Sequence, residues 1–156
     1  MYFRGMFGPM AWGLGAVSAG WGQLRDRPEE WKQGARGYGL RYGSGLAQRI
    51  TRETLQYGAS SLLHEDNRYL PSERTGKGPR IGYALESTFL TYKPDGSRRF
   101  AFSRIGSILG GSMISRAWQP ASTSGMSHAA ENFGVAVGFA AGFNVLREFM
   151  PAKFRK

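Results

Sequence analysis

The sequence predicts an all-α protein, a compact bundle of about five helices packed through faces of small, GxxxG-like residues. The apolar residues of one segment recur at steps of three and four, as on one side of a helix: Phe102, Ile105, Leu109 and Met113. Glycine accounts for 23 of 156 residues and is scattered through apolar segments rather than gathered in linkers. Few segments alternate apolar and polar residues or are rich in β-branched residues, which argues against a β-barrel.

Five segments have the pattern of helices, at 8–24, 35–63, 80–92, 100–118 and 127–149. Between the first two, Pro28 followed by two glutamates suits the start of a short helical turn. The stretch 64–80 is expected to be a loop because it is rich in proline and glycine. The stretch 93–99 is expected to be a loop with a tight turn at Pro-Asp-Gly. With its basic tail at 150–156, the chain 1–156 has the length of a single helical domain.

Four of the predicted helices carry small residues four positions apart, along one side of each helix. We call these stripes helix-packing ladders, and they are Ala11, Gly15 and Ala19; Gly39, Gly43 and Ala47; Ser103, Ser107 and Gly111; and Gly134, Gly138 and Gly142. A glycine destabilises a helix interior by about 1 kcal/mol relative to alanine. Their repetition therefore indicates that another backbone approaches closely, as is most familiar between helices in membranes.

The segment 1–24 is expected to interact with a membrane or to act like a signal. It is uncharged from Gly5 to Leu24, the nominal length of a membrane span. Val17–Ala19 resembles a signal-peptidase site, but the glycines and proline before it make a weak signal, which favours an uncleaved segment. Charged residues inside the other helices favour a membrane-associated or partly embedded bundle over one that spans repeatedly. A wholly soluble bundle is the alternative.

The net charge of +10 suits contact with anionic lipid, nucleic acid or an acidic protein. Lys153, Arg155 and Lys156 follow an apolar helix and are expected to contact an anionic surface. The basic segment RTGKGPR at 74–80 supports an alternative function, a soluble helical protein that binds nucleic acid and lies in the cytoplasm. Against that alternative, the charges are spread along the chain and no nucleic-acid-binding motif is present.

The densest polar cluster is His64, Glu65, Asp66 and Arg68. It is expected to be structural, with the acids at the end of the second helix holding arginines such as Arg68 or Arg74. Adjacent His, Glu and Asp residues cannot all face one ion from a regular helix, and the pair of His128 and Glu131 offers too few ligands, so no metal site is expected.

Four further charged residues are candidates for ion pairs buried between helices: Glu53, Glu86, Arg104 and Arg116. Their convergence in one cavity would support another alternative, a membrane protein with an ion- or proton-handling site. The chain has no cysteine and no nucleophile–base set, so no catalytic residue or cofactor is expected and the chain is predicted not to be an enzyme.

Several segments together resemble an uncharacterised family of small Gly-rich bacterial proteins that are usually predicted to be exported to the cell envelope. The segments are WGQLRDRPEEWKQGARGYGLRYGS, LLHEDNRYL, RRFAFSRIGSILGGSMISRAWQP and NVLREFMP, within a similarity from about Trp21 to Pro151. The resemblance implies a setting at the membrane or in the periplasm and no known activity. Family members tend to have a longer N-terminal region with a clearer secretory signal, and this chain differs from them there.

These observations predict a structural or accessory helical protein of the bacterial cell envelope. It is expected to associate with the membrane and to pack against itself or a partner's helices through its helix-packing ladders. The four tryptophans are expected at interfaces, because indole suits a boundary between apolar and wet surroundings. They are Trp12, Trp21, Trp31 and Trp118.

Overall fold

The computed structural model describes residues 9–93 and 95–150, with side chains described from residue 12. In chain order the elements are α2 (Pro9–Leu24), η1 (Glu29–Trp31), α3 (Gly34–Leu63), α4 (Lys77–Phe89), β1 (Leu90–Tyr92), β2 (Arg98–Phe100), α5 (Phe102–Ile114), η2 (Ser115–Ala117) and α6 (Met126–Phe149). The prediction of an all-α bundle of about five helices is confirmed.

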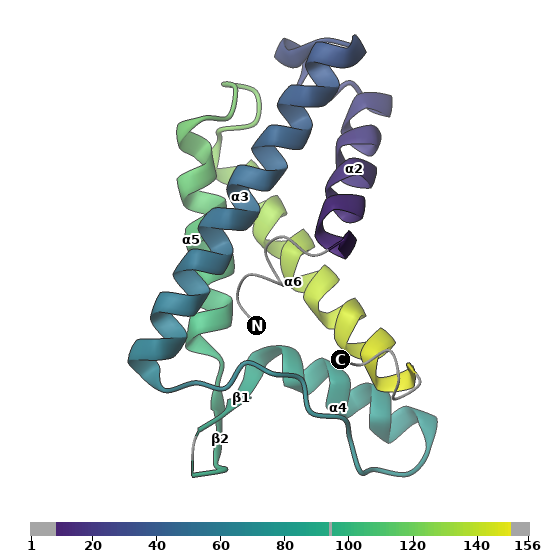
Figure 1. Ribbon diagram of the computed structural model, residues 1–156, viewed down its shortest axis with the longest axis vertical. Helices are drawn as coiled ribbons and strands as arrows, with labels where there is room; N and C mark the ends of the chain where they lie inside the picture. The colour runs from purple at the N-terminus through teal and green to yellow at the C-terminus, as the bar shows by residue number, and fades with distance from the viewer. Residues whose placement is uncertain (1–8, 94, 151–156) are drawn as a thin grey trace.

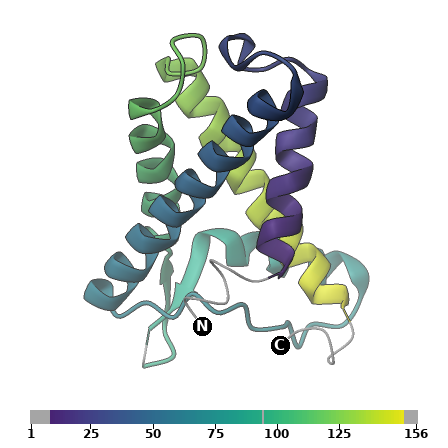
Figure 2. The same ribbon diagram turned by 45° about the horizontal axis from the view of Figure 1, so that its top comes forward.

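Helix α3 is the centre of the arrangement, with α2 and α5 packed on it (Figure 1). Helix α6 runs diagonally across the bundle and packs on α5 and α4. Helix α4 crosses one end of the molecule beside the hairpin β1–β2, and Figure 2 shows this arrangement of the helices from another direction. We call this the α4 end.

Helix α3 ends where the sequence predicts, and its ending positions the next segment. His64 takes the left-handed conformation with φ 53°, and its N–H bonds to the carbonyl of Ser60. The chain then leaves the helix, and the N–H of Asp66 donates to the carbonyl of Tyr92 at 2.9 Å. This contact holds the segment after α3 beside strand β1.

The predicted helix 80–92 is wrong at both ends. Helix α4 begins earlier, at Lys77. Pro79 fits in its first turn, because backbone N–H groups there have no partner within the helix and the N–H that proline lacks is not needed. It ends at Phe89, because Leu90 adopts an extended conformation and starts the hairpin. Leu-Thr-Tyr is a β-branched and aromatic sequence that suits a strand. The predicted tight turn is confirmed, since Gly96 has φ +80° and its N–H bonds to the carbonyl of Lys93.

The interior of the described structure is mainly polar. The largest side chains that are fully buried are Glu148, Thr88, Thr91, Ser103, Ser112 and Ser115. Among the described side chains, Ile108 is the only buried aliphatic one larger than alanine. A water-soluble domain of this size ordinarily buries many Leu, Ile, Val and Phe side chains. Here the hydrogen-bonding groups lie inside and most of the large apolar side chains lie outside.

The helix-packing ladders of α5 and α2 do contact other helices. On α5, Ser103 and Ser107 are buried, and a Cβ atom placed on Gly111 would lie 3.2 Å from Cβ of Arg52 on α3. On α2, Ala19 is buried, and a Cβ on Gly15 would lie 3.2 Å from the ring of Tyr42. The side chain of Ala11 lies outside the described residues.

Among the described residues, the ladders of α3 and α6 do not contact another helix, and their predicted packing against a partner's helices stays a prediction. In the part of the chain that the structure describes, no atom lies within 4 Å of a Cβ atom placed on any of five glycines in these two ladders: Gly39, Gly43, Gly134, Gly138 and Gly142. All five are exposed, whereas Ala47 is partly buried. The physical reason is that α3 turns other residues toward α2 and α5, and α6 contacts its neighbours through Ala129, Asn144 and Glu148.

Candidate functional site

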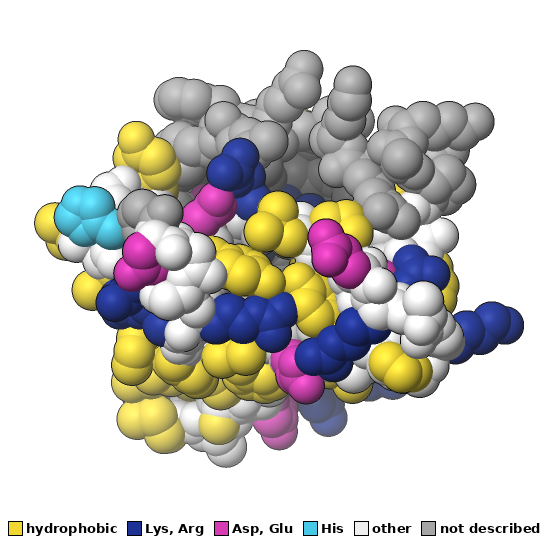
Figure 3. All heavy atoms as spheres, turned by 90° about the horizontal axis from the view of Figure 1, so that it is seen from below, with side chains coloured by type: hydrophobic (Ala, Val, Ile, Leu, Met, Phe, Trp, Pro, Cys, Tyr) yellow, Lys and Arg dark blue, Asp and Glu magenta, His cyan; other side chains and the backbone are white. Residues whose placement is uncertain are grey.

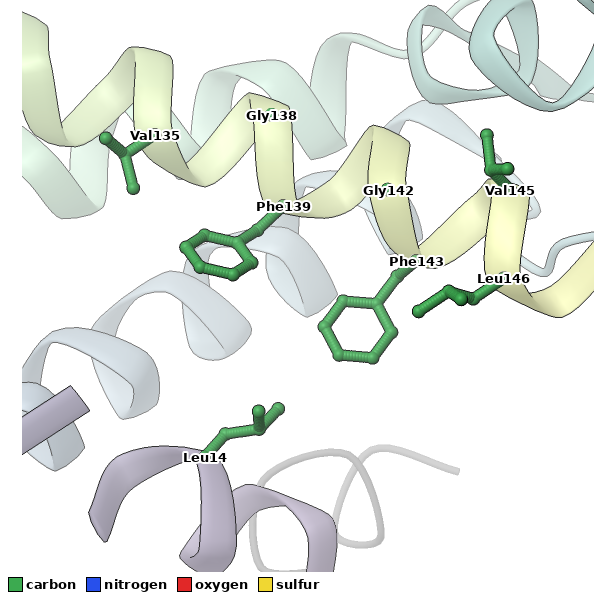
Figure 4. A pocket seen from close by; sticks show the side chains of 8 residues that line it. All are labelled: Leu14, Val135, Gly138, Phe139, Gly142, Phe143, Val145 and Leu146. Atoms are coloured by element: carbon green, nitrogen blue, oxygen red, sulfur yellow. The ribbon is translucent and has the colours of Figure 1, made fainter. Parts of the chain in front are cut away.

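An apolar groove lies between α2 and α6, with a volume of about 700 Å³. Its lining is Leu14 from α2 and, from α6, Val135, Gly138, Phe139, Gly142, Phe143, Val145 and Leu146. Figure 4 shows Leu14 facing the rings of Phe139 and Phe143 across the open space. Among the described residues, no charged one lines this groove, so its surface suits contact with hydrocarbon or with another apolar helix.

The local sequence of α6 explains the groove. Gly138 and Gly142 have no side chains, so the floor between the two phenylalanines is bare backbone surface. Phe139 is 64% exposed and Leu146 is 57% exposed. Exposed apolar surface that is contiguous in this way marks contact with a partner or a membrane.

Among the described residues, α6 is the only helix long and apolar enough to cross a membrane. The core helix of a soluble protein can meet the same criterion, but such a helix is mostly buried. Only 11% of the most apolar stretch of α6 is buried inside the molecule. Its 24 residues correspond to roughly 36 Å of helix, which exceeds the hydrocarbon thickness of a bilayer.

The predicted polar cluster does not form one unit. Asp66 and Arg68 do pair, with Nη2 of Arg68 2.6 Å from a carboxylate oxygen of Asp66. The hydrogen bonds from Arg68 lower the pKa of Asp66 below its ordinary value of 3.8. Glu65 turns the other way and accepts hydrogen bonds from the N–H and hydroxyl of Ser103, while Arg99 lies 3.2 Å from its other oxygen. His64 is exposed and ends the helix through its backbone.

Glu65 therefore has a role that the sequence did not suggest. Its carboxylate lies at the first turn of α5, where the free N–H groups and the helix dipole favour a negative charge. Adjacent residues after α3 thus have different roles. Asp66 pairs with Arg68 in the same segment, whereas Glu65 accepts the N–H of Ser103 in the first turn of α5.

The expected ion pairs between helices are absent from the described structure. Glu53 lies 3.3 Å from its sequence neighbour Arg52, and Glu86 lies on the surface near Arg74 and Arg98. Arg104 donates to the backbone carbonyls of Ser87, Thr88 and Asn67. Arg116 donates to the carbonyl of Ser124. Carbonyl groups in the last turn of α4 and in two loops accept the hydrogen bonds of these two guanidiniums. The four charged residues therefore do not converge in a cavity.

The most buried charged residue, Glu148, was missed by sequence reasoning. Its carboxylate accepts hydrogen bonds from the hydroxyl of Tyr69 at 2.6 Å, the N–H of Ser72 at 3.0 Å and Nε of Arg80 at 2.8 Å. Asn144, one turn earlier, donates to the hydroxyl of Thr88 on α4. These contacts fasten the last turns of α6 to the α4 end. The available signal was an acid and an amide in an otherwise apolar helix.

Arg41 has a similar role at the opposite end of the molecule. Its guanidinium donates to the carbonyls of Arg27, Pro28 and Lys32 and to the side chain of Gln23. It thereby holds the turn between α2 and α3. The backbone of that turn lies so close to Gly37 that a side chain there has no room.

Basic side chains lie across the surface of the α4 end, with acidic side chains beside them and hydrophobic side chains along one edge (Figure 3). In the segment RTGKGPR, Arg74 pairs with Glu86 and Arg80 pairs with Glu148. Arg80 therefore forms a close intramolecular pair at 2.8 Å, whereas Arg74 lies 3.5 Å from Glu86. Lys153, Arg155 and Lys156 lie outside the described residues.

Two of the four tryptophans lie on the surface of α2. Trp12 is 43% exposed and Trp21 is 57% exposed. Trp118 instead donates its indole N–H to the hydroxyl of Ser44 at 3.1 Å, and it joins the end of α5 to α3.

Comparison of the chain with protein families, curated proteins and solved structures gave no match.

Proposed function

We propose that this chain is a structural or accessory protein of the bacterial cell envelope that places the outer face of α6 and the neighbouring face of α2 in apolar surroundings. The observation that carries the proposal is the inverted distribution of polarity. Glu148 and Thr88 are fully buried, whereas Phe139 and Leu146 are more than half exposed. Burying an apolar side chain such as that of Phe139 or Leu146 stabilises a protein by about 1.5–3 kcal/mol, and this stabilisation is absent while the side chain is exposed to water.

A lipid bilayer is the surrounding that fits this surface best. Each exposed apolar side chain can contact hydrocarbon, while the polar contacts of Glu148 and Arg104 remain inside the protein, as lipid requires. Trp12 and Trp21 on α2 suit the interfacial region. The resemblance to small bacterial envelope proteins, inferred from the sequence segments, implies the same setting.

The exposed ladder on α6 supports a second contact within that setting. Gly134, Gly138 and Gly142 leave open backbone surface, which a helix of a second copy or of a partner can approach closely. We therefore propose a scaffolding role in the membrane and no enzymatic activity.

Extraction and flotation test the proposal. In a cell fractionation, we expect the full chain to stay with the membranes in alkaline carbonate and to enter solution in detergent. Purified protein should float with vesicles. Phe139→Asn should reduce the bound fraction about tenfold, because the contact of the Phe139 ring with the hydrocarbon of the bilayer is lost. Leu62→Asn is the matched control, since Leu62 is 82% exposed at the end of α3, outside α6. Complete release by carbonate would contradict the proposal.

A further inference from the structure

A second pocket at the α4 end is lined by charged and aromatic side chains. Its volume of about 490 Å³ lies in the range of small-ligand sites, roughly 300–1,000 Å³. The loop before α4 provides Ser72, Glu73 and Arg74, and α4 provides Tyr83. The hairpin provides Tyr92 and Arg98.

Two arginines from distant segments converge on this pocket. The guanidinium carbons of Arg74 and Arg98 lie 5.5 and 4.9 Å from the centre of the Tyr83 ring. The hairpin register places Arg98 opposite Tyr92, and Nε and Nη2 of Arg98 donate to the Tyr92 hydroxyl at 3.0 and 2.9 Å. The two positive charges are therefore oriented by aromatic contacts.

The carboxylate of Glu86 lies between these two guanidiniums without a close contact to either. Its oxygen is 3.5 Å from Nη2 of Arg74 and 3.9 Å from Nη1 of Arg98. Well-formed contacts between a guanidinium and an oxyanion measure about 2.7–2.9 Å. Both arginine side chains also remain partly exposed, at 46% and 35%. An oxyanion that contacts Nη1 of Arg98 and Nη2 of Arg74 more closely than Glu86 does can therefore displace it.

The wall of the pocket is held in place by buried groups. Glu148, which has no exposed side-chain surface, accepts the N–H of Ser72, and Tyr83 donates its hydroxyl to the carbonyl of Leu70. The N–H of Arg74 donates to the hydroxyl of Ser72. A ligand would thus meet a loop that is already ordered, which lowers the entropy lost on binding.

We propose that Arg74 and Arg98 form a binding site for a phosphate group, with Glu86 as the internal competitor. Arginine forks match phosphate oxygens in a bidentate geometry. Glu73 also lines the pocket, and its negative charge opposes the binding of an anion. Because Ser72 is tied to Glu148 in the last turn of α6, the pocket lies where lipid headgroups meet the end of that helix. This assignment to a headgroup phosphate rests on the proposed function.

Titration of the full chain with inorganic phosphate tests the site without a membrane. The protein is kept in a non-ionic detergent at constant ionic strength, and binding is measured by calorimetry. We expect Arg74→Gln and Arg98→Gln each to weaken binding about tenfold, because each removes a charged hydrogen-bond donor. Glu86→Gln should strengthen binding several-fold, because the competitor is gone. Arg36→Gln, an exposed change on α3, should have no effect.

The Glu86→Gln variant separates a binding site from an ordinary surface ion cluster. In a merely structural cluster, removing the acid would leave phosphate affinity unchanged, and that result would overturn the proposal. Failure of both the unmodified chain and Glu86→Gln to bind phosphate would overturn it as well. These readouts do not depend on whether the arginine variants fold.

Vesicle flotation distinguishes a lipid headgroup from a soluble phosphate. Vesicles of galactolipid contain no phosphate and report only the apolar contact of α6. Vesicles of phosphatidylglycerol should bind the unmodified chain more tightly, and Arg74→Gln/Arg98→Gln should lose most of this gain. Lys32→Gln/Arg36→Gln removes the same charge from the opposite end and should keep most of the gain.

The combined results identify the ligand source. Loss of the gain in the arginine variant alone supports a headgroup phosphate. Equal loss in both double variants, with calorimetric binding intact, supports a soluble phosphate as the ligand. Failure to float with galactolipid, with phosphate binding intact, would contradict the membrane proposal and leave the phosphate site standing.

Discussion

Helices α5 and α6 both carry small residues four positions apart. A Cβ atom placed on Gly111 of α5 would lie 3.2 Å from Arg52 of α3, whereas no described atom lies within 4 Å of one placed on Gly138 of α6. The small residues of α5 are buried beneath a neighbouring helix, whereas those of α6 form the floor of an exposed groove. The comparison teaches that the spacing alone identifies a face suited to close contact. Whether the contact is inside the chain depends on which other residues of the helix bind its neighbours.

The largest expected effect concerns the way in which α6 is attached to the packed part of the molecule. We expect Glu148→Ala to destabilise the protein by about 4 kcal/mol, because it leaves the buried polar groups of Tyr69, Ser72 and Arg80 without their shared acceptor. Chemical unfolding in detergent measures the loss. Glu131→Ala is the control on the same helix, where an exposed pair with His128 contributes less than about 1 kcal/mol. Equal effects of both changes would contradict this account.

The next effect concerns a glycine that is required by a close approach. A Cβ atom on Gly37 would collide with the carbonyl oxygens of Trp31 and Lys32. We expect Gly37→Ala to lower the free energy of unfolding by about 3 kcal/mol, because the backbone of the turn must move. Gly39→Ala, two residues away in open surroundings, should instead stabilise α3 by about 1 kcal/mol. A gain in both variants would show that the turn is not close-packed.

A smaller effect, opposite in sign on the two helices, compares α5 and α6 directly. Gly138→Ala should raise the free energy of unfolding of the chain in detergent by about 1 kcal/mol, because the helix gains propensity and no contact is disturbed. Gly111→Ala should lower it, because its Cβ meets Arg52 at 3.2 Å. If the α6 ladder holds a second helix, Gly138→Ala should also weaken self-association or partner capture, measured by sedimentation. A loss of stability in Gly138→Ala would contradict the open groove.

The smallest effect concerns the loop that leads into α6. The carboxylate of Glu30 accepts the N–H and hydroxyl of Ser122 at 3.0 and 2.6 Å, and the hydrogen bond from the hydroxyl chiefly lowers the pKa of Glu30 below 4.5. Because the folded-state pKa is the lower one, this contact is intact above pH 4.5 and is lost as the pH falls through the lowered pKa. The amide signal of Ser122 in a nuclear magnetic resonance titration should report this change. Glu30→Gln should abolish the titration, and Glu29→Gln should leave it intact.

Much of the fold follows from the sequence because its causes are local. The helix expected at 127–149 is observed at Met126–Phe149, and the one expected at 35–63 is observed at Gly34–Leu63. The strand Leu90–Tyr92 was missed because three residues are too few to show a period, and its partner strand fixes it from elsewhere in the chain. The Pro-Asp-Gly turn was found because its backbone requirement lies within the turn itself.

The partners of charged residues could not be predicted in the same way. Glu148 is 79 residues from Tyr69, and Glu65 is 38 residues from Ser103, so neither pairing leaves a trace in local spacing. The ladder pattern correctly marked the buried face of α5, but it gave no indication that the glycines of α6 are open. That distinction depends on the direction in which Asn144 and Glu148 point, and this is set by the α4 end.

The polar interior also has a thermodynamic consequence. The heat capacity of unfolding arises from the hydration of newly exposed apolar surface, and an ordinary domain gives about 12–15 cal/mol/K per residue. Threonine, serine and glutamate side chains occupy the centre of this molecule, so calorimetry should find a smaller value. The temperature curve of its stability should then be broad and flat, with little weakening in the cold.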